Sequence, residues 1–312
     1  MRAIGVTEYG GPEVLGVLNL PEVHAGPTEV RIRVLAAAVN PTDTLARNGS
    51  RVEVQKINPF PYVPGMDAAG VVDEVGAEVE TGVRVGDAVM AMVVPQGTHG
   101  AYRESIVLQG NSVVPAPTGF SHVETCTLPM NGLTATHSLD LLGLEAGQVL
   151  AVTGGAGAYG GYMIELGKNA GLTVLSDSSD TDLDLVKNLG ADIVVPRGDD
   201  FSKKVRSYFP EGVDGVADGA VLNDLAIAAV RDGGAFTSVR GFKASNVRGI
   251  NFTATYVIEL DGNYEKLDAL REHAENGTVT LRVAQTFIAE KASDAHKTLE
   301  AGGTRGRCVL TF

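Results

Sequence analysis

The sequence predicts an α/β protein whose chain changes character near residue 121. Before that point, short strand-like runs are separated by turn-forming residues, whereas after it strands alternate with segments of helical length. A glycine-rich turn stands between one of these later strands and the helix that follows it. At roughly 150 residues per domain, the chain is long enough for about two domains, each with its own core.

The composition excludes several classes of protein. The chain has 25 basic and 38 acidic residues, a formal net charge of −13. Nucleic acids and anionic membranes are bound by clustered Lys and Arg, so we expect neither as a partner. We find no signal peptide and no apolar run near the roughly 18 residues of a spanning helix. Two cysteines, Cys126 and Cys308, are too few for a disulfide framework. We expect a soluble, cytoplasmic protein.

Residues 1–120 predict a compact, partly barrel-like β domain. Apolar and polar residues alternate over 30–34, and the apolar run continues to Val39. Turn-formers such as Gly76 and Gly86 separate this strand from the later ones. The later strand-like runs are 69–75, 88–94 and 112–116.

Residues 121–250 predict a parallel sheet with helices on both faces, because strands that alternate with helices imply right-handed crossovers. The strand-like segments are 149–153, 173–176, 193–196, 215–218 and 235–239, and the helix-length segments between them are 159–170, 182–189, 203–209 and 222–230. The tail, residues 251–312, predicts in order a helix, a strand, a short helix and a final strand, which are 264–276, 281–288, 291–301 and 307–312. Periodicity alone leaves open whether this tail extends the parallel sheet or returns to the first domain.

The strongest chemical signal is the turn after the strand 149–153. It reads Gly155-Ala156-Gly157-Ala158-Tyr159-Gly160, a complete G-x-G-x-x-G pattern. Gly155 permits a tight turn, Gly157 lets the backbone approach a pyrophosphate, and Gly160 lets the helix pack closely on the strand. The helix start offers N–H groups and a positive dipole end to the anion. No Gly-Lys-Ser/Thr follows, so we expect a dinucleotide rather than ATP or GTP.

The choice of dinucleotide stays open at this stage. Asp177 lies 20 residues after Gly157, close to the position of an acid that binds the ribose of NAD. Strand side chains alternate faces, so Ser178 is the alternative residue toward the ribose, with room for the 2′-phosphate of NADP. Three basic residues on neighbouring loops are candidate sources of positive charge: Arg197, Arg240 and Lys243.

Several segments together resemble one known family. They are Ala38-Val39-Asn40-Pro41-Thr42-Asp43, the stretch 61–72 (Pro-Tyr-Val-Pro-Gly-Met-Asp-Ala-Ala-Gly-Val-Val), Gly100-Ala101-Tyr102-Arg103-Glu104, Gly132-Leu133-Thr134-Ala135, and the ending 305–310. In this order, and over nearly the whole length, they are similar to zinc-free medium-chain dehydrogenases/reductases of the quinone oxidoreductase (zeta-crystallin-like) family.

The resemblance implies a fold and an assembly. Residues 1–120 would form a GroES-like, partly open β-barrel that carries the catalytic residues. Residues 121–250 would form a Rossmann domain with a doubly wound parallel sheet, and the segment 251–312 would be shared between an extension of that sheet and a return to the first domain. The active site would be the cleft between the domains, in a homodimer or homotetramer. The resemblance favours NADP(H) as the cofactor, with NAD(H) as the alternative.

The same alignment of motifs predicts that no zinc is bound. Zinc-dependent relatives hold the metal with an early Cys and the His of a Gly-His-Glu stretch, but this chain has Asn40 and Met66 at those places. A thioether cannot replace imidazole on Zn²⁺, and the first 125 residues contain no cysteine. We expect the six scattered histidines to lie on the surface or in loops.

Without a metal, the expected substrate accepts hydride with modest help, as quinones and activated alkenes do. A hydrogen-bond donor near the developing oxyanion would suffice. Asn40 resembles the family position beside the nicotinamide and is our first candidate. Tyr62 is a second candidate donor, and a structural tyrosine is the alternative. Asp43 either orients Asn40 or caps a helix, and we favour the cap.

The remaining cofactor assignments come from the same resemblance or from the glycine loop. Thr134 resembles a threonine near the nicotinamide, Tyr159 is assigned through its backbone N–H, and Val239 ends the strand 235–239. Arg305 would reach a cofactor phosphate, and a solvated charge is the alternative. The sequence thus predicts a quinone or enone reductase. The alternatives are an enoyl-thioester or 2-alkenal reductase, and a dinucleotide-binding sensor without catalysis.

Overall fold

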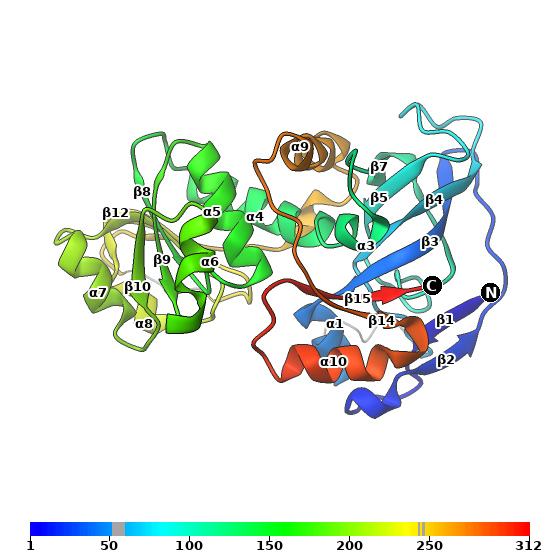
Figure 1. Ribbon diagram of the computed structural model, residues 1–312, viewed down its shortest axis with the longest axis horizontal. Coiled ribbons are helices and arrows are strands. Elements are labelled where there is room, and N and C mark those ends of the chain that lie inside the picture. The colour runs from blue at the N-terminus through cyan, green and yellow to red at the C-terminus, as the bar shows by residue number, and fades with distance from the viewer. Residues whose placement is uncertain (52–59, 243, 245–246) are drawn as a thin grey trace. The chain divides into compact units, whose positions relative to one another are not determined.

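The computed structural model describes residues 1–51, 60–242, 244 and 247–312 (Figure 1). Lys243 therefore lies outside the described residues. The contacts within the chain define two compact units. Unit 1 comprises Met1–Met130, Leu260–Asn276 and Leu281–Phe312, and unit 2 comprises Asn131–Glu259 and Gly277–Thr280. Relative to the expected limits of 120 and 250, the first boundary falls ten residues later and the second nine residues later (130 − 120 and 259 − 250).

Unit 1 is built on a seven-stranded sheet and a separate hairpin. The sheet has the order β14-β15-β3-β4-β5-β7, with β6 on β3, and β1 pairs with β2. The strands are β1 (Arg2–Gly5), β2 (Gly16–Asn19), β3 (Glu29–Val39), β4 (Asp67–Val75), β5 (Ala88–Met92), β6 (Ser105–Gln109), β7 (Val113–Pro115), β14 (Val283–Ile288) and β15 (Arg307–Thr311). The helices are α1 (Pro41–Arg47), α3 (His122–Thr125), α9 (Tyr264–Glu275) and α10 (Ala292–Glu300).

The strand β3 organises unit 1. Its alternating residues Val30, Ile32 and Val34 are fully buried in one core cluster, as their period of two predicts. β3 pairs antiparallel with β4, β6 and β15, with Leu310 of β15 opposite Ala37. The C-terminal tail therefore returns to the first domain, as the family resemblance implied.

Unit 2 contains a six-stranded, fully parallel sheet (Figure 1). Its strands are β8 (Val149–Thr153), β9 (Thr173–Ser178), β10 (Ile193–Pro196), β11 (Val213–Asp218), β12 (Val230–Ser238) and β13 (Asn251–Ala254). Its helices are α5 (Ala158–Asn169), α6 (Leu183–Asn188), α7 (Phe201–Tyr208) and α8 (Asp224–Ile227); α4 (Pro129–Leu142) contains the boundary between the units. The order β10-β9-β8-β11-β12-β13 is that of a Rossmann sheet, which confirms the predicted fold class.

Some predicted elements differ from the structure for identifiable reasons. The expected helix over 222–230 is helical only at α8, because Val230 already pairs with Val213 at the start of β12. The tail also contributes to both sheets, since β13 extends the parallel one. None of the described helices is long and apolar enough to cross a bilayer.

The core of unit 2 yields a test of the fold. Phe236 is fully buried in β12 and its ring packs near those of Phe242 and Phe252. Replacing Phe236 with Ala leaves a cavity there, so we expect Phe236→Ala to cost about 3–5 kcal/mol of unfolding free energy. Tyr208 is 55% exposed, and Tyr208→Ala should change it by less than about 0.5 kcal/mol. Urea unfolding followed by circular dichroism measures both; equal costs would contradict the assigned core.

Candidate functional site

The glycine loop joins β8 to α5 in unit 2. Gly157 caps the helix with φ −71° and ψ 167°, and Gly154 has the left-handed φ of +75°. The tight turn therefore depends on Gly154, the residue before the one we expected. Gly155 is needed for another reason, because a Cβ there would overlap Ser176 Oγ of β9. A Cβ on Gly160 would overlap the carbonyl oxygen of Gly154, so helix and loop are in close contact, as predicted.

Gly157 differs from its two neighbours in the pattern. A Cβ built there would come within 4 Å of one atom only, the Gly154 carbonyl oxygen at 3.2 Å. Packing of the protein thus restricts Gly157 less than Gly155 and Gly160, whose nearest contacts would be much shorter, and Gly157 lies at the N-terminus of a twelve-residue helix. A ligand with an anionic group fits this place, since the helix start favours negative charge. The loop therefore fits the pyrophosphate of a dinucleotide.

Asp177 holds the glycine loop from the next strand. Its carboxylate is 1% exposed, and Oδ1 accepts hydrogen bonds from the N–H groups of Gly154 at 2.5 Å and Gly155 at 3.4 Å. Oδ2 lies 3.4 Å from Nε of Arg197. The Asp177 carboxylate thus stabilises the glycine loop by accepting hydrogen bonds from its N–H groups. Ser178, which ends β9, is 3% exposed and donates through Oγ to the carbonyl of Ser179 at 2.6 Å.

The other predicted cofactor residues are placed as follows. The Tyr159 hydroxyl donates to Ser138 Oγ at 2.8 Å, so its side chain is tied to α4 rather than pointing into the loop. Thr134 is buried one turn before Ser138 in α4. Val239 directly follows β12 and is half-buried. Arg305 belongs to unit 1, in the turn before β15.

In unit 1, Asn40 lies between two buried carboxylates. It is fully buried at the end of β3, where it precedes α1. Its amide Nδ2 donates to Asp67 Oδ2 at 2.6 Å, and its main-chain N–H donates to Asp43 Oδ2 at 2.8 Å. Asp67 Oδ1 accepts a further hydrogen bond from the N–H of Met130 at 2.7 Å. Both the backbone and the side-chain amide of Asn40 are thus held in place.

Burial dominates the electrostatics of the two carboxylates. It raises the pKa of Asp67 to about 7, against the hydrogen bonds from Met130 and Asn40 and the attraction of the Arg307 guanidinium. It raises the pKa of Asp43 to about 6, against hydrogen bonds from Asn40, Gly65 and Tyr102 and the attraction of Arg307. Each pKa is raised because the charged form is poorly solvated.

Asp43 caps α1, as predicted, by accepting the N–H of Asn40. The role of Asp67 was not predicted, although the residue stands in the quoted stretch 61–72. Its position two residues after Pro64-Gly65 is the only sequence signal we can name. Tyr62 is 7% exposed, exchanges backbone hydrogen bonds with Val6 and packs on Ala46. Its role as a donor stays a prediction.

The expectation that the histidines lie on the surface or in loops is wrong for two of them. His296 on α10 is fully buried, and His137 on α4 is 9% exposed. Both lie on helix faces that pack against the protein, which a lone histidine in a sequence does not reveal. In the described part of the chain, no cluster of three or more His, Cys, Asp or Glu side chains is arranged to hold a metal ion.

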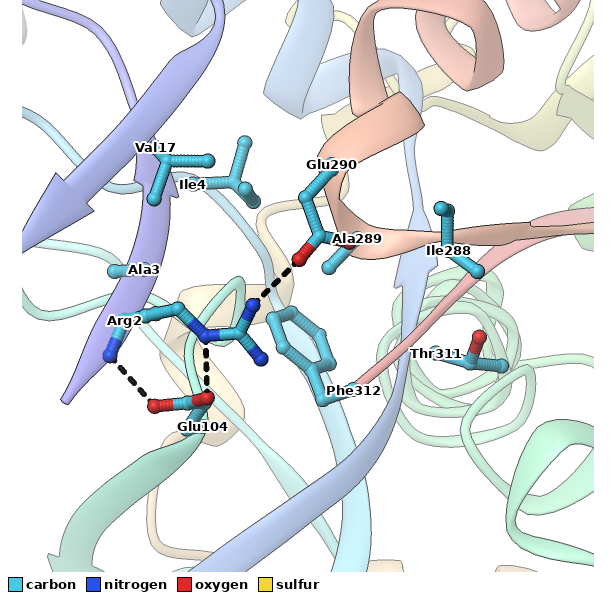
Figure 2. A pocket seen from close by; sticks show the side chains of 10 residues that line it. All are labelled: Arg2, Ala3, Ile4, Val17, Glu104, Ile288, Ala289, Glu290, Thr311 and Phe312. Carbon is cyan, nitrogen blue, oxygen red and sulfur yellow. Dashed lines mark hydrogen bonds and ion pairs between the residues drawn. The ribbon is translucent and has the colours of Figure 1, made fainter.

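Figure 2 shows the residues that line a cavity of about 210 Å³ in unit 1. Arg2 at its edge pairs with Glu104 and Glu290, each at 2.7 Å, and so links β1 to the segments before β6 and after β14. Two carboxylates already neutralise this guanidinium. The cavity contains none of the residues of the loop or of the Asn40 site.

The chain matches two described families and several curated proteins. Residues 26–118 match "Alcohol dehydrogenase GroES-like domain" and residues 189–310 match "Zinc-binding dehydrogenase". A 2-methylene-furan-3-one reductase of Solanum lycopersicum is 30% identical over 99% of this chain and 79% of its own length. The chain belongs to the medium-chain dehydrogenase/reductase superfamily.

Two further relatives have related names, and for one of them a solved structure shows the same fold. An NADPH-dependent alkenal/one oxidoreductase of Arabidopsis thaliana is 29% identical over 99% of this chain and 79% of its own. The solved quinone oxidoreductase of Coxiella burnetii is 27% identical, with a TM-score of 0.87 over 100% of this chain and 99% of that one. This medium-chain dehydrogenase/reductase is thus related to quinone and alkenal oxidoreductases, as the sequence motifs indicated.

The glycine loop can be tested with a matched pair of variants. In Gly157→Val the added Cβ has one close neighbour, the Gly154 carbonyl oxygen at 3.2 Å, so we expect the protein to fold but to lose binding of either nicotinamide dinucleotide by at least about 100-fold, since the side chain fills the space of the ligand. Gly160→Val should lower the melting temperature as well, because its Cβ meets the Gly154 carbonyl. Dinucleotide fluorescence titration and thermal denaturation measure both. Normal binding by Gly157→Val would refute the loop assignment.

The buried Asp67 predicts a pH-dependent effect on stability. Its pKa in the folded protein, about 7, lies above the ordinary value of 3.8, so the folded chain binds more protons than the unfolded chain between these values. The stability that this carboxyl contributes is present at low pH and lost as pH rises through about 7. We therefore expect the melting temperature of Asp67→Asn, relative to wild type, to improve from about pH 5 to about pH 8. An unchanged difference would contradict the burial of an ionisable group here.

Proposed function

We propose that the protein is a zinc-independent, NAD(P)H-dependent oxidoreductase that reduces a quinone or an activated alkene. The observation that carries the proposal is the sparse packing around Gly157, where an added Cβ would meet one protein atom within 4 Å, at the helix start where β8 leads into α5. The names of the relatives support reduction of conjugated carbonyl compounds. A bound dihydronicotinamide would supply the hydride.

The residues of unit 1 suit a substrate whose oxygen becomes negatively charged. Hydride addition to a quinone or enone leaves a phenolate or enolate, and a fixed hydrogen-bond donor stabilises that charge. We assign the amide of Asn40 as this donor. Asp67 and Asp43 hold the amide and the backbone of Asn40, so the donor needs little rearrangement during the reaction. The thioether of Met66, where zinc-dependent relatives have imidazole, is a poor zinc ligand.

We propose NADPH as the preferred dinucleotide. Asp177 is engaged by the loop N–H groups, so it is poorly placed to accept the ribose hydroxyls that distinguish NAD. Ser178 ends the same strand, and the N–H of Arg197 donates to its carbonyl at 2.7 Å. The Arg197 side chain is 49% exposed at the carboxyl edge of the sheet, where a guanidinium suits a 2′-phosphate.

The cofactor proposal gives a charge-removal test. Arg197→Gln should raise KM for NADPH about three- to tenfold and leave KM for NADH within about twofold, because a half-exposed charge-assisted bond contributes modestly. Lys203→Gln is a matched loss of one positive charge on the exposed side of α7 and should change neither value. Steady-state kinetics with both dinucleotides measure the ratio. An equal effect on NADH and NADPH would contradict 2′-phosphate recognition by Arg197.

The reaction itself is tested by a substrate panel. Purified protein with NADPH or NADH is mixed with a naphthoquinone, a cyclic enone, a 2-alkenal and an enoyl thioester, and loss of dihydronicotinamide absorbance is followed. We expect the largest kcat/KM for a quinone or enone. A larger kcat/KM for the thioester or the alkenal would favour the alternative reductase, and tight dinucleotide binding without turnover would favour a sensor. Cytoplasmic location and a homodimer or homotetramer remain predictions from the sequence.

A further inference from the structure

A chain of hydrogen bonds links the C-terminal helix α10 to Asn40 within unit 1. Tyr102, after β5, contacts Asp43 Oδ2 at 3.2 Å and His296 Nε2 at 3.3 Å. His296 Nδ1 lies 3.2 Å from Arg47 Nη1, and Arg47 Nη2 donates to Glu300 at 2.6 Å. The four side chains of this path, Asp43, Tyr102, His296 and Arg47, are each at most 2% exposed. Residues far apart in the sequence thus form one buried polar path.

Chemistry fixes the direction of these hydrogen bonds. Arg47 can only donate, so His296 Nδ1 must accept. The neutral imidazole then carries its proton on Nε2 and donates to the Tyr102 oxygen. The Tyr102 O–H therefore points to Asp43, whose carboxylate also accepts the N–H groups of Asn40 and Gly65, at 2.8 and 3.0 Å. From Arg47 Nη1 through His296 and Tyr102, each donor points toward the Asp43 carboxylate, while Arg47 Nη2 donates to Glu300 at the other end.

A charged Asp43 is needed for this arrangement. A protonated Asp43 would have to donate, although Tyr102, Asn40 and Gly65 all present donors to it. The other charged groups that face it are the Arg307 guanidinium, which favours the carboxylate, and Asp67, which opposes it. Burial keeps His296 neutral, because it lowers the pKa of that imidazole to about 3, with Arg47 acting in the same direction. The path is therefore intact near neutral pH.

We propose that Tyr102 and His296 are positioning residues for the reduction, because they stabilise the Asp43 carboxylate that holds the backbone of Asn40. The proposal rests on the proposed function, in which Asn40 is the donor to the substrate oxygen. It assigns to α10 a purpose beyond packing, since the buried histidine of the C-terminal segment completes the support of a residue more than 200 positions earlier (296 − 40).

The test is the pH profile of kcat/KM for the best substrate of the panel. Tyr102→Phe removes one hydrogen bond that lowers the pKa of Asp43, so the acid limb should move upward by about one pH unit. At a pH one unit below the midpoint of the wild-type acid limb, the loss of kcat/KM relative to its plateau should then be about tenfold larger in Tyr102→Phe than in wild type. His296→Leu should shift the limb in the same direction by less, and His296→Gln, which keeps a donor, should partly restore it.

Ile106→Val is the control for a general loss of stability. Ile106 is fully buried in the same core cluster as Tyr102, but its apolar side chain takes no part in the hydrogen bonds of the path. It should lower the melting temperature without moving the acid limb. If wild type turns over and Tyr102→Phe has the wild-type acid limb, or if Ile106→Val shifts it equally, the positioning role is refuted while the proposed function stands. Absence of turnover by wild type with every substrate would refute both.

Discussion

The close approach of Gly160 to the carbonyl oxygen of Gly154 is the constraint on which the functional part of unit 2 depends. With any side chain at residue 160, the first turn of α5 would be displaced from the end of β8. Asp177 adds a second restraint by accepting the loop N–H groups. These contacts fix a helix start at which Gly157 is the least crowded of the three glycines of the pattern. The anion-binding site that we propose is thus a consequence of how the loop and the helix pack together.

In unit 1, the corresponding constraint is on Asn40, whose neutral amide is held in a fully buried position at the end of β3. Two buried carboxylates fix Asn40, and burial raises the pKa of both. Such groups cost stability when ionised, so their presence is better explained by a requirement for orientation than by one for stability. The tail supplies part of the support, since β15 pairs with β3 and α10 contributes His296.

The sequence predicts local secondary structure well, but it does not reveal contacts between residues that are far apart in the chain. The strand 149–153, the helix after it and the pairing of glycines with a turn follow from period and residue type, and β8 and α5 were located within one residue. The return of the tail followed only from the family resemblance, because pairing of β15 with β3 joins segments about 270 residues apart (308 − 39). For the same reason Asp67, Tyr102 and His296 were missed. Each is unremarkable in its own segment, and their common path exists only once three distant segments meet.

The most direct test of the central claim is a phosphorus NMR titration of NADPH with the purified protein. If the loop at Gly157 seats the diphosphate, both pyrophosphate resonances should shift or broaden and saturate at one dinucleotide per chain. The 2′-phosphate resonance should respond in the same titration. Pyrophosphate resonances that stay at their free positions with excess protein would contradict the account.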